Sequence, residues 1–452
     1  SFVKIEQWDQ AKKSWSDYAD FYGQGEFLFA SYQKTAELSA KNGDWKGATE
    51  PYLAYLTKYP QHADVYLAYE KLAYLYVRRN DKVRAVRFFG KSLPKLSPPK
   101  KREAHLMMGD LYLQLDQFDS AKIVFDLAYA SASNAKDSAK ALGGRLASLA
   151  MLGKKKQFQK GYKVFRSEFE DNLEIHARIL YYDGRNLMEK KQEKRARKRF
   201  QYLADKFEET SWAAEGHFYL GTLSFKRSEF DDAGRLLQSY LKQSPDGRNS
   251  QDARFKLAGC QYQLKKYAAS AKSYEMVLAS DKGEDLTKYR ASYNAALAWE
   301  KAGNWIGAAK NYQRIYELYT EYQNPTSVLV SAGFAWFNGS NFSKAKESFV
   351  KALKDSTSDR RAEAHYWYAK TLDRLEDVEE ALSEFLKVSY LYNGEGMWGL
   401  TALFEVGQIY QRSGDKPRAA KMYQKIVEQD GKSGTLGRRA SKYLELLEGT
   451  GG

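Results

Sequence analysis

The side chains that most often perform catalysis or bind metals are few in this sequence and lie far apart. Its 452 residues include one cysteine and five histidines, which are His62, His105, His176, His217 and His365. No two histidines are spaced as metal ligands usually are. Cys260 has no histidine near it in sequence, so we expect a buried structural thiol rather than a nucleophile. These residues predict no metal site and no catalytic cysteine.

One stretch matches a cofactor motif by its letters alone. GEGMWG, at 394–399, fits the pattern G-x-G-x-x-G. A dinucleotide site needs that pattern between a strand and a helix, whereas this stretch follows a predicted helix and lies in a loop. The carboxylates are scattered and offer no facing acid–base pair. We therefore predict a protein that is not an enzyme and binds no cofactor.

Composition favours long helices in several domains or in a linear array. The chain is 43% hydrophobic and 15% aromatic and contains only 8 prolines. A chain of this length is too long for one compact core. No apolar run is long enough for a transmembrane helix. A single cysteine excludes an internal disulfide framework but does not identify the compartment.

The net charge of +15 is confined to one part of the chain. Residues 78–206 contain 30 lysines and arginines against 15 aspartates and glutamates, which accounts for the whole excess. The remainder is neutral. A charge excess this localised indicates a basic surface rather than a generally basic protein.

A repeat of about 37 residues runs through the sequence. Its eleven copies centre on a small residue: Ala48, Ala85, Ala121, Gly161, Ala196, Ala233, Ser270, Ala308, Ala345, Ala381 and Ala419. Four residues later ten of the eleven copies have an aromatic residue, and twelve residues earlier ten have Ala or Gly. Offsets of three, four and seven fall on one face of a helix. Each copy is therefore predicted to be two helices joined by a short turn, which must stack on its neighbours to bury its apolar face.

These features resemble the tetratricopeptide repeat, most clearly in HFYLGTLSFKRSEFDDAGRLLQSYLKQSP (217–245) and LFEVGQIYQRSGDKPRAAKMYQKIV (403–427). The resemblance implies an all-α, right-handed solenoid. The spacing of about 37 residues exceeds the 34 typical of the family. The copy centred on Gly161 is the least regular, because Leu149 replaces its first small residue. We expect looser packing or a change of curvature there.

The predicted organisation has three parts. Residues 1–30 contain the second helix of an incomplete repeat and a linker, 31–432 contain eleven repeats, and 433–452 form a capping helix and tail. In the first part, Trp8, Trp15 and Tyr18 surround Ala11 at the repeat's own spacing. We therefore expect the natural polypeptide to extend further at its N-terminus, or another chain to cover residues 1–20.

A partner-binding groove is predicted on the face formed by the first helices, as the resemblance implies. Aromatic residues occur three positions before the Ala or Gly that lies twelve residues ahead of the repeat centre, and two cations lie beside them. These residues are Tyr181, Phe218, Phe255, Tyr293, Tyr366, Phe404, Arg185 and Lys370. Exposed aromatic residues of this kind would suit a peptide or helix with apolar anchors. The alternative is that these rings pack against adjacent repeats.

A second candidate surface is basic and lies outside that groove. Its residues are Lys154, Lys155, Lys156, Arg195, Arg197, Lys198 and Arg199. They could form a solvated face without a ligand, bind an acidic protein or an anionic membrane surface, or bind nucleic acid. RNA-binding helical repeats carry polar residues at regular positions in every repeat, and no such series occurs here.

The resulting functional prediction is a non-enzymatic scaffold for protein–protein interaction. Segments such as 58–76 and 242–262 resemble repeats of bacterial cell-envelope proteins, which favours a periplasmic or envelope location over a cytoplasmic one. Two alternatives stay open: a nucleic-acid-associated repeat protein, or the non-catalytic arm of a larger enzyme. Binding to nucleic acid would weaken steeply with salt, whereas peptide binding in an aromatic groove would weaken little.

Overall fold

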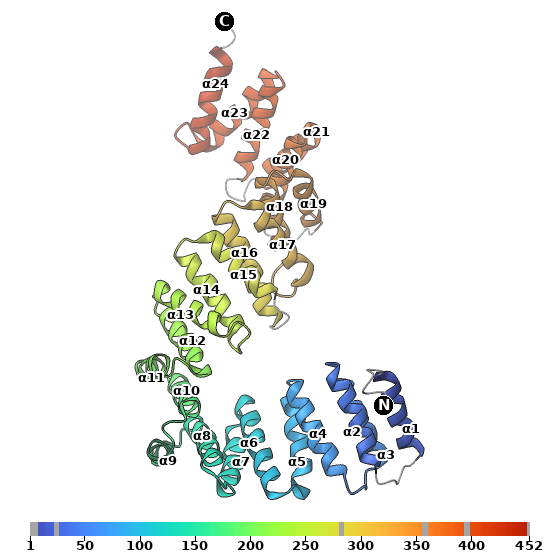
Figure 1. Cartoon of the computed structure of the whole chain (residues 1–452). Coiled ribbons are helices and arrows are strands. Elements are labelled where there is room, and N and C mark those ends of the chain that lie inside the picture. Colours follow the sequence, from blue (N-terminus) through green and yellow to red (C-terminus); the bar gives the residue numbers. More distant parts are fainter. Residues whose placement is uncertain (1–7, 22–26, 280–283, 355–359, 393–397, 450–452) are drawn as a thin grey trace. The chain divides into compact units, whose positions relative to one another are not determined.

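A computed structural model of the chain describes residues 8–21, 27–279, 284–354, 360–392 and 398–449 (Figure 1). These described residues form 24 α-helices and one 3₁₀ turn, Leu93–Lys95, and include no strand. The chain divides into two compact units, Ser1–Leu220 and Gly221–Gly452, and each is described by itself. The predicted all-α fold of stacked helix pairs is confirmed.

The first unit contains eleven complete helices and most of a twelfth. They are α1 (Trp8–Phe21), α2 (Leu28–Lys41), α3 (Glu50–Lys58), α4 (Val65–Arg78), α5 (Lys82–Ser92), α6 (Pro98–Gln114), α7 (Phe118–Ala130), α8 (Ala135–Met151), α9 (Lys155–Glu168), α10 (Leu173–Glu189), α11 (Glu193–Lys206) and α12 (Ser211–Lys226). The boundary between the units falls within α12. Helix α1 covers the segment predicted to be a second helix.

The second unit continues the same pattern of helix pairs. Its helices are α13 (Phe230–Gln243), α14 (Ser250–Gln263), α15 (Tyr267–Leu278), α16 (Asp285–Lys301), α17 (Trp305–Leu318), α18 (Pro325–Asn338), α19 (Phe342–Ala352), α20 (Arg361–Arg374), α21 (Val378–Leu391), α22 (Trp398–Arg412), α23 (Lys416–Asp430) and α24 (Thr435–Gly449). Helix α24 packs on α22 and α23, where the Tyr443 ring meets those of Phe404 and Tyr423, both at 5.3 Å.

The turn inside every helix pair has one residue in the left-handed region of backbone space. These residues are Gly43, Asn80, Asp116, Gly153, Lys191, Ser228, Lys265, Gly303, Ser340, Glu376 and Gly414. This conformation lets the chain reverse within a few residues, and glycine adopts it at no steric cost. Only four of the eleven are glycine, so the other turns retain some strain.

The core of a pair forms where a small residue of the first helix meets an aromatic residue of the second. A Cβ atom added to Gly184 would lie 2.7 Å from the Phe200 ring, and one added to Gly333 would lie 2.6 Å from the Phe349 ring. Both rings are fully buried. The small and aromatic positions of the repeat therefore meet as predicted, and in these two pairs the glycine leaves the ring the room that a Cβ atom would occupy.

None of the helices in the described part of the chain is long and apolar enough to cross a membrane.

Candidate functional site: a basic pocket in the first unit

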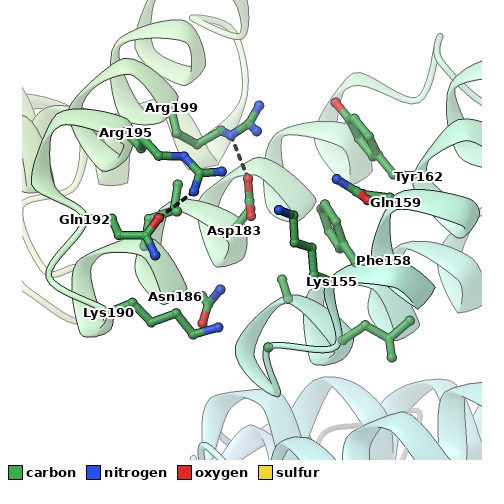
Figure 2. A pocket seen from close by; sticks show the side chains of 14 residues that line it. Lys155, Phe158, Gln159, Tyr162, Asp183, Asn186, Lys190, Gln192, Arg195 and Arg199 are labelled. Carbon is green, nitrogen blue, oxygen red and sulfur yellow. Dashed lines mark hydrogen bonds and ion pairs between the residues drawn. The ribbon is translucent and has the colours of Figure 1, made fainter.

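A pocket of about 350 Å³ opens in the first unit between the end of α8 and the helices α9, α10 and α11 (Figure 2). The residues that line it are Leu149, Ala150, Gly153, Lys155, Phe158, Gln159, Tyr162, Asp183, Asn186, Leu187, Lys190, Gln192, Arg195 and Arg199. We call it the basic pocket, because four of these side chains are cationic and only Asp183 is anionic. Its volume lies within the range typical of small-molecule sites.

The pocket lies in the repeat that the sequence marks as irregular. Helix α8 packs directly against α10, and a Cβ atom added to its Gly143 would lie only 2.1 Å from Ile175. Eleven of the 17 residues of α8 are buried, but α8 packs less extensively on α9 than the two helices of each neighbouring pair, α6–α7 and α10–α11, pack on each other. A change of curvature in this repeat stays a prediction. Leu149, which replaces the usual small residue, is itself buried and contributes to the pocket wall.

Three helices bring the four cations of the pocket together. Lys155 begins α9, Lys190 follows the end of α10, and Arg195 and Arg199 lie one turn apart on α11 (Figure 2). Arg199 Nε contacts Asp183 Oδ2 at 2.8 Å, and Arg195 donates a hydrogen bond to the Gln192 side chain. Among the described residues, the side chains of Lys155, Lys190 and Arg195 form no ion pair. The pocket therefore carries an uncompensated positive charge.

Two aromatic rings of α9 form an apolar wall of the pocket. Phe158 and Tyr162 lie nearly parallel, with ring centroids 5.6 Å apart and an angle of 10°. The Tyr162 hydroxyl is 2.7 Å from Nε2 of His176 on α10. His176 is buried, and burial is the main cause that lowers its pKa. The histidine therefore holds the Tyr162 ring in place and is neutral near pH 7.

The structure brings together three of the seven basic residues predicted from the sequence, because Lys155, Arg195 and Arg199 line the pocket. Lys198 lines a hollow of about 250 Å³ beside it, together with Arg195 and Arg199. Lys154 and Lys156 are exposed next to Lys155, and Arg197 is partly exposed. Whether this surface binds a partner stays a prediction.

Most of the aromatic residues predicted for the groove are packed inside the repeats. Tyr181, Phe218, Tyr366 and Phe404 are buried, whereas Phe255 and Tyr293 are partly exposed. Four of the six pack on the aromatic residue nineteen positions later: Phe255 on Tyr274 at 5.2 Å, Tyr293 on Tyr312 at 6.3 Å, Tyr366 on Phe385 at 5.7 Å and Phe404 on Tyr423 at 5.5 Å. Tyr181 packs on Trp212 at 4.9 Å. The four contacts at nineteen positions join the two helices of one repeat, whereas the contact of Tyr181 with Trp212 joins adjacent repeats, as the alternative expected. A binding role for these rings stays a prediction.

The two cations predicted beside those rings are already paired. Arg185 contacts Asp116 at 3.2 Å, and Lys370 contacts Glu405 at 3.0 Å. Both side chains are largely buried, with exposed fractions of 13% and 22%. A ligand in the predicted groove would have to compete with these carboxylates for them.

The residues considered for catalysis have structural surroundings. Burial raises the pKa of the Cys260 thiol to about 11, so the reactive thiolate is scarce near neutral pH. His365 is buried against Glu384, which it contacts at 2.5 Å. Within the described ranges no cluster of three or more His, Cys, Asp or Glu could hold a metal ion. The first four residues of GEGMWG lie outside the described residues, and α22 begins at Trp398.

Of the charged and aromatic residues that line the pocket, sequence reasoning missed four: Phe158, Tyr162, Asp183 and Lys190. Phe158 and Tyr162 lie on α9, whereas Asp183 lies on α10 and Lys190 directly follows it, so the four come from two adjacent repeats. Their convergence depends on the close packing of α8 against α10. The signal that could have located them was the irregular repeat itself. A misplaced large residue at Leu149 changes how the helices around it can pack.

Family models for the tetratricopeptide repeat match four parts of the chain. A model described as "Tetratricopeptide repeat-like domain" matches residues 159–302, and three models described as "Tetratricopeptide repeat" match 103–134, 336–395 and 401–433. The first match begins within α9 at the wall of the basic pocket. The four matches together support the resemblance to the tetratricopeptide repeat in both the N-terminal and the C-terminal half of the chain.

The solved structures to which the chain is similar are distant from it in sequence. A structure from the functional characterisation of Pseudomonas aeruginosa pilF has a TM-score of 0.37 and 19% identity, and the match covers 49% of this chain and 93% of that one. The crystal structure of the APC/C hetero-tetramer Cut9–Hcn1 has a TM-score of 0.32 and 14% identity, and the match covers 99% and 94%. That of YrrB, titled a TPR protein with an unusual peptide-binding site, has a TM-score of 0.33 and 18% identity, covering 42% and 91%. No curated protein sequence matches the chain.

Proposed function

Because the chain contains tetratricopeptide repeat domains, we propose that it is a non-enzymatic scaffold for protein–protein interaction. The partner surface that we propose is the basic face of α8–α11, and its partner is an acidic segment of another protein. The observation that supports this choice is the charge of residues 78–206, which contain 30 basic residues and only 15 acidic ones.

The arrangement of these charges favours a partner over a merely solvated face. Lys155, Lys190 and Arg195 approach one another from three helices without a carboxylate partner among the described residues. Like charges held close together repel, so an anion that binds between them relieves the repulsion. Exposed Lys154, Lys156 and Lys198 extend the positive surface around this centre. An acidic segment would gain both faster encounter and specificity from such a patch.

Binding of a model acidic polypeptide tests the proposal. Fluorescence anisotropy would compare polyglutamate with a single-stranded RNA that carries the same number of charges, both titrated into the whole chain at several salt concentrations. We expect polyglutamate to bind about tenfold more tightly than the RNA. A reversed preference, with the steep salt dependence of phosphate binding, would instead support the nucleic-acid alternative.

A matched pair of variants assigns the binding to this surface. The substitutions K154Q/K156Q/K198Q remove three exposed charges of the first unit, and K242Q/K266Q/K272Q remove three exposed charges from the second unit. We expect only the first triple variant to weaken polyglutamate binding. Equal weakening by both would mean that net charge alone drives binding, and the proposal would fail. An envelope location stays a prediction from the resemblance.

A further inference from the structure

The basic pocket has features that an electrostatic surface does not need. It is a concave site of about 350 Å³, it combines four cations with one carboxylate, and two stacked rings form part of its wall. Figure 2 shows Lys155, Arg195 and Arg199 around Asp183, with Phe158 and Tyr162 on the side of α9. Charged and apolar surfaces that meet in one hollow indicate a ligand with both characters.

The charges of the pocket exceed what one carboxylate can compensate. Asp183 occupies the Nε side of Arg199, which leaves Lys155, Lys190 and Arg195 without an ion pair among the described residues. A single carboxylate would leave most of this charge unbalanced. A phosphate monoester carries close to two negative charges at pH 7 and has three acceptor oxygens that point in different directions. Cations that approach from three helices suit such a tetrahedral anion better than a planar one.

The aromatic wall adds a second requirement. Tyr162 cannot turn away from its position easily, because its hydroxyl is bonded to buried His176 at 2.7 Å. Phe158 stacks on Tyr162 and lies on the same face of α9. The stacked rings offer an apolar surface on which another ring can pack.

We propose that the basic pocket is a binding site for a phosphate monoester carried on a flat ring. Lys155, Lys190 and Arg195 bind the phosphate oxygens, Asp183 keeps Arg199 oriented, and the ring of the ligand packs on Phe158 and Tyr162. This inference goes beyond the proposed function, because it holds for a free ester and for one carried on a partner protein. The phosphate site and the proposed function can each be disproved without the other, because polyglutamate binding on the outer lysines does not require the pocket to hold a phosphate.

Calorimetric titration of phenyl phosphate into the whole chain at low salt tests the site. Inorganic phosphate lacks the ring, and benzoate keeps the ring but carries one charge. We expect phenyl phosphate to bind about tenfold more tightly than either of these. No detectable binding of phenyl phosphate at about 5 mM, or equal binding of the three probes, would overturn the proposal.

Two matched variants distinguish binding in the pocket from a general effect of positive charge on affinity. K155Q/R195Q removes two pocket cations from α9 and α11, and K163Q/K194Q removes two exposed cations of the same helices that do not line the pocket. All four residues are exposed, so both variants should retain the helical fold, which circular dichroism verifies. The pocket variant should lose at least about tenfold in affinity for phenyl phosphate and the other variant less than about twofold. Equal losses would contradict a built site.

A third variant tests the ring. Phe158→Leu (F158L) should weaken phenyl phosphate severalfold while leaving inorganic phosphate unchanged, and a parallel loss for both probes would contradict the role of the aromatic wall. A short peptide that contains phosphotyrosine tests whether the natural ligand is a free ester or one carried on a partner protein. Binding as tight as that of phenyl phosphate supports an ester carried on a partner, and much weaker binding supports a free ester. Absence of binding by both compounds overturns the site.

Discussion

The guanidinium of Arg178 on α10 contacts the carboxylate of Asp110 on α6 at 2.7 Å, although 68 residues separate them in the chain. A second pair, Arg185 with Asp116, joins the same two regions at 3.2 Å. Helix α8 lies in contact with both α6 and α10. These ion pairs therefore fasten three first helices together in the unit that contains the basic pocket.

Removing the first of these pairs should loosen the first unit. Arg178→Met should raise hydrogen exchange in α6 and α10 by an amount that corresponds to about 1 kcal/mol, because the Arg178 side chain is only 15% exposed but Asp110 is 45% exposed. A double-mutant cycle with Asp110→Asn measures the coupling. A coupling energy near zero would mean that the pair does not hold the helices together.

The close contact between the small and the aromatic residue of a repeat predicts that adding one methyl group at the small position lowers stability markedly. Gly184→Ala places a Cβ atom 2.7 Å from the Phe200 ring and should destabilise the α10–α11 pair by about 1–3 kcal/mol. Hydrogen exchange of these two helices measures the loss. Phe200→Leu in the same chain should recover part of it, since a smaller side chain leaves room for the methyl group. A neutral effect of Gly184→Ala would contradict the close approach.

The left-handed turn residues predict a stabilising substitution. Lys265 has φ of 58° and is exposed, so Lys265→Gly should stabilise the α14–α15 pair by about 1 kcal/mol. The reverse change at the equivalent turn, Gly303→Ala at φ of 76°, should destabilise the α16–α17 pair by a similar amount. Thermal unfolding monitored by circular dichroism compares the two. A destabilising Lys265→Gly would show that the lysine makes a compensating contact.

Buried His176 predicts a pH dependence of the first unit. Burial lowers its pKa, as do Arg166 and Arg199, whereas Glu170 raises it. The unfolded chain therefore binds a proton more readily than the folded one. The stability that this residue contributes is complete above the ordinary pKa of about 6.5 and decreases as the pH falls below it. Exchange in α9 and α10 should accelerate between pH 7.5 and pH 5.5, the range around that pKa.

A variant isolates this residue from others that titrate in the same range. His176→Gln cannot gain a proton and should reduce the acceleration in α9 and α10. His105, whose pKa is also lowered by burial, should continue to affect α6 in the variant. An unchanged pH dependence of α9 and α10 would show that another group is responsible.

The repeat made much of the fold predictable, because its spacing reflects a contact that recurs in each pair. Gly184 and Phe200 lie 16 residues apart, as do Gly333 and Phe349, and both pairs meet in the core. The turn positions were predictable as turns but not as left-handed residues, since Lys265 and Glu376 have no preference for that conformation.

The candidate sites were less predictable, because each depends on which residues cover or surround a side chain in the folded chain. The rule that placed Tyr366 and Phe404 in a groove describes the direction of a side chain and not what covers it. Both rings are covered by aromatic residues nineteen positions later. The basic pocket needed Lys190 and Tyr162 from neighbouring repeats, and their approach follows from the packing of α8 on α10. No spacing within one repeat contains that information.

The central claim is that an acidic partner docks on the basic face of the first unit. Hydrogen exchange of the whole chain with and without polyglutamate tests it most directly, since it locates binding without prior choice of a residue. We predict protection of α8–α11, residues 135–206, and none in the second unit. Protection confined to the second unit, or to the first helices that carry the aromatic residues, would contradict the claim.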